Sequence, residues 1–78
     1  MPRIEFELDR EHVELNQLLK LCGVCGSGGA GKALVASGVV RVDGEVELRK
    51  TRKIRAGDLV KVENVEIAVV NAGTSRDP

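Results

Sequence analysis

A glycine-rich stretch in the first half of the chain has residue types that could bind phosphate. Residues 25–35 read CGSGGAGKALV, in which Gly26, Gly31 and Lys32 have the spacing of a phosphate-binding P-loop. Position 33 is Ala, where a P-loop has the Ser or Thr hydroxyl that coordinates Mg²⁺, and the preceding residues have a helical pattern instead of a strand pattern. We therefore interpret the stretch as a turn between two helices, in which glycines permit unusual or close-packed backbone. The start of the second helix could still hold a phosphate of a polynucleotide backbone.

Two cysteines and one histidine are the other residues with chemical potential. Cys22 and Cys25 form a C-x-x-C pair, but the chain has no second pair of cysteines, and His12 is its only histidine, so the ligand set of a zinc site is incomplete. A redox pair is expected at a helix N-terminus, whereas this pair lies at a helix end and in a turn. We expect Cys22 in the core and Cys25 in the turn, and His12 to assist capping or solvation at a helix start. No catalytic group, metal or cofactor is predicted, and the chain is not expected to be an enzyme.

A run of basic residues is the strongest charge feature. The formal net charge is zero, yet residues 20–61 contain nine bases and four acids, and the densest part, RKTRKIR at 49–55, has five bases in seven residues. A single surface charge usually serves only solvation, but such a run could bind a polyanion, and arginine can form paired hydrogen bonds with a phosphate. The single aromatic residue, Phe6, is expected in the core. Stacking on single-stranded bases is therefore not expected, which favours recognition of shape and phosphates.

The secondary structure that must position these side chains follows from hydrophobic periodicity. The alternation in residues 4–8 predicts a strand, after which Asp9 could cap a helix that ends near Cys22. A second helix is expected from Ser27 to Gly38, with Gly28 and Gly29 at its start and against the first helix. A period of two after Gly38 then predicts a hairpin turning at Asp43-Gly44. Residues 53–58 are expected to form a loop with a turn at Gly57, followed by two short strands or a hairpin over residues 59–71.

The length and composition limit the overall architecture. With 78 residues, the chain is predicted to be one domain, with a core of aliphatic residues and a disordered tail at 72–78. There is no run of 18 apolar residues and no apolar signal segment, so we expect neither membrane insertion nor secretion, and a cytoplasmic location. The predicted fold class is α+β: two packed helices against a small, mostly antiparallel sheet of four to five strands.

The order of these elements, together with specific motifs, resembles a known family. The run SGGAGKALVASGVVRVDGEVELRKTRKIRAGDLVKV, preceded by LNQLLKLCG, is similar to the S-four-type RNA-binding domain, or alpha-L motif, and in particular to its small stand-alone members of the YbcJ/YaaA type. The resemblance covers about residues 13–62. Gly31 stands where the family usually has Ala, which predicts a helix less stable by about 1 kcal/mol. The family's signature positions correspond to Gly28, Gly29, Lys32, Gly38, Gly44, Arg49, Lys50, Lys53, Gly57 and Asp58.

The resemblance implies a protein that holds structured RNA, such as ribosomal or transfer RNA, through a basic face. Together with the basic run, we expect this binding to be mainly by phosphate contacts and the protein to be a monomer. Two alternatives remain open at this stage: a module that binds an acidic protein partner through the same face, and a nucleotide-binding protein that uses the P-loop-like turn. The residues expected to contact RNA are Lys20, Ser27, Gly28, Gly29, Lys32, Arg41, Arg49, Lys50, Arg52, Lys53 and Arg55.

Overall fold

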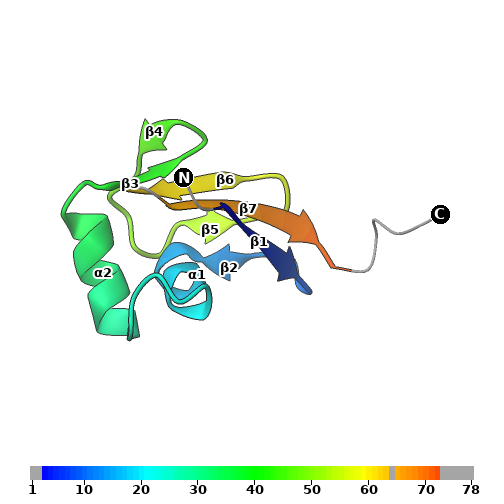
Figure 1. Ribbon diagram of the computed structural model, residues 1–78, viewed down its shortest axis with the longest axis horizontal. Helices are drawn as coiled ribbons and strands as arrows, with labels where there is room; N and C mark the ends of the chain where they lie inside the picture. The colour runs from blue at the N-terminus through cyan, green and yellow to red at the C-terminus, as the bar shows by residue number, and fades with distance from the viewer. Residues whose placement is uncertain (1–2, 64, 73–78) are drawn as a thin grey trace.

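The protein consists of a mixed five-stranded sheet, a separate two-stranded ribbon and two helices (Figure 1). The structure is a computed structural model that describes residues 3–63 and 65–72. The predicted disordered tail lies, apart from its first residue, outside these described residues. In chain order the elements are β1 (Arg3–Leu8), β2 (Val13–Glu14), α1 (Leu15–Leu21), α2 (Gly28–Ala36), β3 (Val40–Val42), β4 (Glu45–Val46), β5 (Lys53–Ile54), β6 (Leu59–Val62) and β7 (Val65–Asn71).

The strand order of the main sheet is β1-β7-β6-β3-β4. Strand β1 runs parallel to β7, and every other pair is antiparallel, so the predicted α+β class with a mostly antiparallel sheet is confirmed. The two helices lie side by side on one side of this sheet (Figure 1). Strands β2 and β5 form the separate antiparallel ribbon next to α1.

The core between the helices and the sheet is aliphatic, as the composition predicts. In α1, Leu15, Leu18 and Leu19 are fully buried, and they form one cluster with Ile54 of β5 and Ile67 of β7. The single aromatic side chain, Phe6, is half-buried against this cluster. Neither helix of the described residues is long and apolar enough to cross a lipid bilayer.

The first helix begins later than the sequence predicts. Asp9 does not cap it: residues 13 and 14 pair with β5, and α1 starts only at Leu15. Glu14 is the N-cap residue, but its side chain makes no capping hydrogen bond. Pairing in the ribbon holds these two residues in an extended conformation, which shortens the helix. The same shift places His12 before β2, so the predicted place of His12 at a helix start is wrong.

The second helix starts where the sequence predicts, but its glycines have different roles. The Ser27 side chain accepts a hydrogen bond from the Ala30 N–H at 3.1 Å, which is an N-cap contact. A Cβ added at Gly28 would meet no neighbouring atom within 4 Å, and one at Gly29 would meet none of α1, so the prediction that these two glycines pack against α1 is wrong. A Cβ at Gly29 would meet only the Ser27 hydroxyl, at 3.9 Å. Gly31 makes the close approach, as described next.

Gly31 is where the two helices come closest. A Cβ at Gly31 would lie 2.9 Å from the Asn16 carbonyl oxygen of α1 and 3.3 Å from the Cys25 sulfur. The first of these neighbours is backbone, which cannot move aside as a flexible side chain can. Glycine at this position therefore lowers the helix propensity of α2 but allows the two helices to pack closely.

The turns after α2 agree with the sequence prediction. Gly38 and Gly57 both adopt positive φ, at 83° and 99°. Asp43 (φ 53°) and Gly44 (φ 89°) form the hairpin turn between β3 and β4, since two successive positive φ angles match the twist of a two-residue hairpin. One detail differs: Lys53 and Ile54, predicted to lie in a loop, form β5.

Candidate functional site

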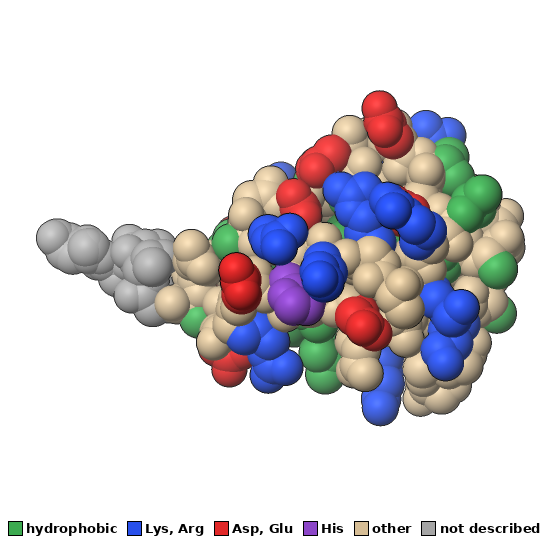
Figure 2. Space-filling model, turned by 180° about the vertical axis from the view of Figure 1, so that it is seen from behind, with side chains coloured by type: hydrophobic (Ala, Val, Ile, Leu, Met, Phe, Trp, Pro, Cys, Tyr) green, Lys and Arg blue, Asp and Glu red, His purple; other side chains and the backbone are tan. Residues whose placement is uncertain are grey.

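Five basic residues lie in the segment that follows β4 and includes β5. We call this the basic surface and define it as Arg49, Lys50, Arg52, Lys53 and Arg55. Together with Thr51, four of these residues (all but Lys50) line an open depression of about 340 Å³. Figure 2 shows a cluster of basic side chains on this face, and more of them on either side of the single histidine. The depression has no acidic lining residue.

The backbone of the basic surface is fixed to the first helix. The N–H groups of Leu15 and Asn16, at the start of α1, donate to the carbonyl oxygens of Arg52 (2.9 Å) and Lys50 (3.0 Å). These bonds satisfy N–H groups that a helix start leaves without intrahelical partners. The N–H of Arg52 also donates to the Arg49 carbonyl at 3.2 Å and closes a turn. The segment that carries the cations therefore caps α1, which makes it part of the folded core structure.

A buried carboxylate lies beneath two of the arginines. Glu47 is only 7% exposed, and its N–H donates to the Val40 carbonyl, so it continues the pairing of β4 with β3. Its Oε1 accepts a hydrogen bond from Arg52 Nη1 at 2.8 Å, and its Oε2 accepts from the Nε and the backbone N–H of Arg49 at 3.1 and 3.0 Å. The hydrogen bonds lower the pKa of Glu47 from 4.5 to about 2, and the side-chain bonds from Arg49 and Arg52 have the largest effect. The hydrogen bond to Glu47 likewise raises the pKa of Arg52 above its ordinary value.

This contact divides the basic surface into two kinds of cation. Arg49 and Arg52 share their charge with Glu47, and the Arg52 side chain is only 32% exposed, against 75% for Arg49. Lys50, Lys53 and Arg55 are exposed and form no ion pair within the described part of the chain. Because an unpaired exposed cation can turn toward a ligand without breaking another bond, these three are the least committed charges of the surface, and two of them, Lys53 and Arg55, line the depression. The sequence analysis treated all five as equivalent and did not assign a role to Glu47.

The turn that follows Arg55 is held by a second carboxylate. Asp58 Oδ2 accepts from the Arg55 N–H at 2.9 Å, and the Asp58 N–H donates back to the Arg55 carbonyl at 3.1 Å. Gly57, between them, donates its N–H to Val69 of β7. The glycine-aspartate turn thus fixes the end of the basic surface to the main sheet.

The other residues predicted to contact RNA do not line the depression. Lys20 is exposed in the last turn of α1, and Lys32 is exposed on α2. Arg41 lies on the outer face of the main sheet, between Val46 of β4 and Lys61 of β6. Ser27, Gly28 and Gly29 form the start of α2.

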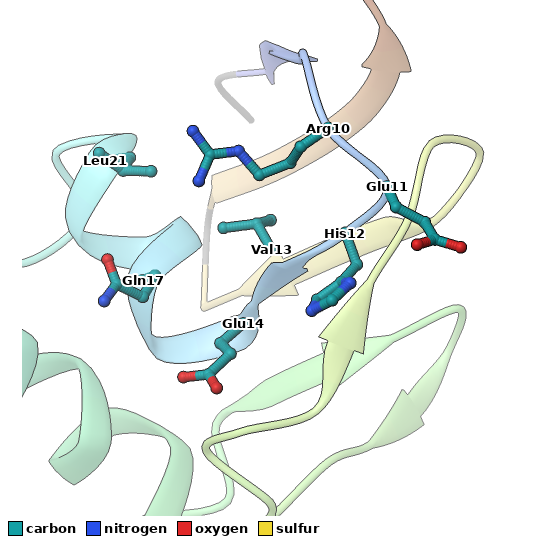
Figure 3. A pocket seen from close by; sticks show the side chains of 7 residues that line it. All are labelled: Arg10, Glu11, His12, Val13, Glu14, Gln17 and Leu21. Carbon is teal, nitrogen blue, oxygen red and sulfur yellow. The ribbon is translucent and has the colours of Figure 1, made fainter.

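The histidine borders a second, larger pocket of mixed charge. The volume of this pocket is about 570 Å³ (Figure 3). Arg10 extends over Val13 toward α1, while Glu11 points away. With bases and acids on the same rim, the pocket has no single sign of charge that would select a polyanion. Its lining residues are Arg10, Glu11, His12, Val13, Glu14, Gln17 and Leu21.

Both cysteines are free, partly buried and packed against the core. Cys22 packs against the core, and burial raises the pKa of its thiol. The Cys25 thiol donates to the Ser27 carbonyl at 3.4 Å, within the turn before α2. Among the described residues, no group of three or more His, Cys, Asp or Glu side chains is placed to hold a metal ion.

The fold and the basic segment are those expected for the family that the sequence resembles. A family model for the S4 domain matches residues 6–70. The chain therefore belongs to the S4 domain family, as the resemblance predicts.

Individual relatives agree with this assignment. The chain is 49% identical over 59 residues to a protein of Escherichia coli (strain K12) named "Putative RNA-binding protein YbcJ", covering 76% of this chain and 84% of that protein. It is 39% identical over 56 residues to the "Probable ribosome maturation protein RlbA" of Bacillus subtilis (strain 168), covering 72% of this chain and 79% of that protein. The solution structure of Escherichia coli YbcJ, described as revealing an αL motif involved in RNA binding, matches with a TM-score of 0.65 and 43% identity. That match covers 90% of this chain and 87% of the other.

Proposed function

We propose that this protein binds structured RNA, ribosomal or transfer RNA in particular, chiefly through phosphate contacts of the basic surface. The observation that carries the proposal is the depression lined by four cationic side chains and no acidic one, on a segment fixed to α1. Relatives that are 49% and 39% identical are named for RNA binding and ribosome maturation, which supports the choice of RNA among polyanions. Residues 13–62 form the core of the proposed RNA-binding unit.

The two kinds of cation have different roles in this proposal. Lys53 and Arg55, which line the depression and whose side chains form no ion pair among the described residues, contact phosphates directly. Arg52 is held by Glu47 and presents fewer free donors, so its main effect is to fix the segment. Lys20, Lys32 and Arg41, with the α2 start at Ser27, Gly28 and Gly29, extend the contact when the RNA is large enough to reach them.

Salt dependence tests the phosphate contacts. Each phosphate contact releases counterions, so log K should fall with log salt by about 0.7–0.9 per contact. Four or five contacts would give a slope of about −3 to −4. Fluorescence anisotropy with a labelled, folded fragment of ribosomal RNA at several salt concentrations measures this slope.

Substitutions then locate the contacts. Lys53→Ala and Arg55→Ala should each reduce the slope by roughly one contact while leaving the melting temperature nearly unchanged, because exposed charges contribute little to folding. The matched control is Arg3→Ala, an exposed arginine on β1. Equal losses from Arg3→Ala and Arg55→Ala would indicate diffuse attraction without a site. Tighter binding to an acidic protein than to RNA at matched salt would favour a protein partner, and no binding to any folded RNA at low salt would refute the proposal.

A further inference from the structure

The strand that leads into the basic surface has its polar pattern reversed. In the sequence Val46-Glu47-Leu48, the carboxylate is buried at 7% exposure, whereas Val46 and Leu48 are exposed at 48% and 61%. An alternating segment at a sheet edge is expected to turn its aliphatic side chains toward the core and its charge toward water. In this segment the carboxylate is directed inward and the two aliphatic side chains are directed outward.

The register of the hairpin confirms which face is which. Val46 is paired with Arg41, whose neighbours Val40 and Val42 point into the core, so Val46 shares the outer face with Arg41. Glu45 is paired with Val42, on the other side of the strand from Val46, and is exposed at the edge of the sheet. The outward direction of Val46 is thus fixed by strand pairing.

The folded state supports this reversed pattern by specific contacts. A shift of one residue would bury both aliphatic side chains and expose Glu47. That alternative is opposed by the three hydrogen bonds that Glu47 accepts from Arg49 and Arg52 and by its own N–H bond to Val40. A local departure from the usual pattern that the rest of the structure holds in place is expected at a functional surface.

The exposed aliphatic side chains are few, and two of the three are together. Among the described residues, the large hydrophobic side chains that are exposed are Leu21, Val46 and Leu48. Leu21 lies at the end of α1, beside the pocket of mixed charge. Val46 and Leu48 stand immediately before Arg49 in the chain, and Figure 2 shows hydrophobic side chains next to basic ones on this side of the molecule.

Basic residues flank this apolar pair on two sides. Arg49 follows it in the chain, and Arg41 lies across from Val46, with Lys61 as the next residue in the same row of the sheet. Two acids, Glu45 next to Val46 and Glu66 next to Lys61, adjoin the same area, so the bases outnumber the acids by three to two. A ligand suited to aliphatic contact beside these bases is an anion with flat, weakly polar faces. Unpaired nucleotides of a folded RNA have this chemistry, because their bases are apolar on both faces while their phosphates are charged.

We propose that Val46 and Leu48 form an apolar contact surface for unpaired nucleotides, next to the phosphate-binding basic surface. This inference rests on the proposed RNA binding and adds to it a preference for RNA with exposed bases or riboses. The aliphatic contact supplies affinity that does not depend on salt. It also compensates for the lack of aromatic side chains on this face.

The test compares two RNA probes and three proteins. The probes are a labelled ribosomal RNA stem-loop with an internal bulge and a fully paired RNA duplex with the same number of phosphates. The proteins are the parent chain, the double variant Val46→Thr with Leu48→Gln, and the control Leu21→Gln, which removes a leucine of similar exposure, 58%, away from the hairpin. Circular dichroism melting checks that all three are folded. A Val46→Thr single variant, which keeps a β-branched residue in β4, serves if the double variant is unstable.

We expect the double variant to lose the preference for the stem-loop while its salt dependence of binding stays the same. The parent and Leu21→Gln should prefer the stem-loop, and the double variant should bind it roughly tenfold more weakly, a change of about 1.4 kcal/mol, with an unchanged salt slope. Equal affinity of the parent for stem-loop and duplex would overturn the inference and leave phosphate binding intact. The inference would also be overturned if the double variant bound the stem-loop normally but no longer associated with ribosomal particles, because Val46 and Leu48 would then contact a protein. Absence of binding to both probes would refute the proposed function itself.

Discussion

Replacing Glu47 with Gln removes one buried negative charge while keeping the shape of the side chain. Gln resembles the protonated carboxyl group, so the stability difference between the parent and Glu47→Gln reports the interaction of the charged form with Arg49 and Arg52. A pKa lowered from 4.5 to about 2 corresponds to about 3.4 kcal/mol, at about 1.36 kcal/mol per pKa unit. This is an upper bound, because the Arg49 side chain is 75% exposed and water screens its share. We expect a loss of about 2 kcal/mol at neutral pH, from a total stability of about 4–12 kcal/mol for a domain of this size.

The lowered pKa of Glu47 also determines how its contribution to stability changes with pH. Because the pKa of Glu47 is lower in the folded state than in the unfolded state, its contribution is fully present above about pH 4.5 and is lost as pH falls toward 2. The difference between the parent and Glu47→Gln should therefore be constant from pH 5 to 8 and shrink steadily below pH 4.5. Urea unfolding must be followed by circular dichroism, since the chain contains no Trp or Tyr.

The matched control is Glu45→Gln, two residues earlier, which is exposed and should change stability by less than about 0.5 kcal/mol. Effects of the other carboxylates on acid unfolding cancel when variants are compared at each pH. A Glu47→Gln variant as stable as the parent at pH 7, or a stability difference that stays constant down to pH 3, would refute the account of Glu47.

Three other predictions concern the turns and the helix contact. Gly31→Ala should lower the melting temperature despite the better helix propensity of Ala, because its Cβ would lie 2.9 Å from the Asn16 carbonyl, whereas Gly29→Ala should leave it unchanged or raise it. Asp43→Ala should destabilise by about 1 kcal/mol, because Asp43 Oδ1 accepts the Leu59 N–H at 3.0 Å, while Asp43→Asn, which keeps an acceptor and tolerates positive φ, should be nearly neutral in thermal unfolding. Isothermal titration with ATP or GTP and Mg²⁺ should detect no micromolar binding, since the glycine-rich turn lacks the hydroxyl that holds Mg²⁺ in a P-loop.

Most of the fold could be predicted because local patterns and tertiary packing agree. Ser27, Gly38 and the Asp43-Gly44 turn each adopt the conformation that their residue types favour. One exception is the start of α1, which the sequence analysis placed just after Asp9. Pairing of β2 with β5, forty residues away, decides this segment, and no local pattern contains that information.

The glycines illustrate the same limit in a different way. The sequence indicates that several residues between 26 and 31 need freedom or close approach, but it does not indicate which. Gly31, which by propensity alone looked like a weakness of α2, is the residue that lets the helices touch at Asn16. Only the packing of the two helices distinguishes it from Gly28, whose added Cβ would meet nothing.

The candidate site was predictable as a charge run but not as a structure. Five bases in seven residues are visible in the chain, whereas the role of Glu47 depends on which side of the chain its side chain takes just after β4. By alternation alone, Val46 and Leu48 would face the core, and Glu47 would be another surface acid that weakens a basic patch. In the structure this expectation is reversed: Glu47 is buried and accepts hydrogen bonds from Arg49 and Arg52, while Val46 and Leu48 are exposed. A carboxylate beside a basic run can therefore organise that run instead of neutralising it, and the distinction depends on burial, which a sequence pattern does not record.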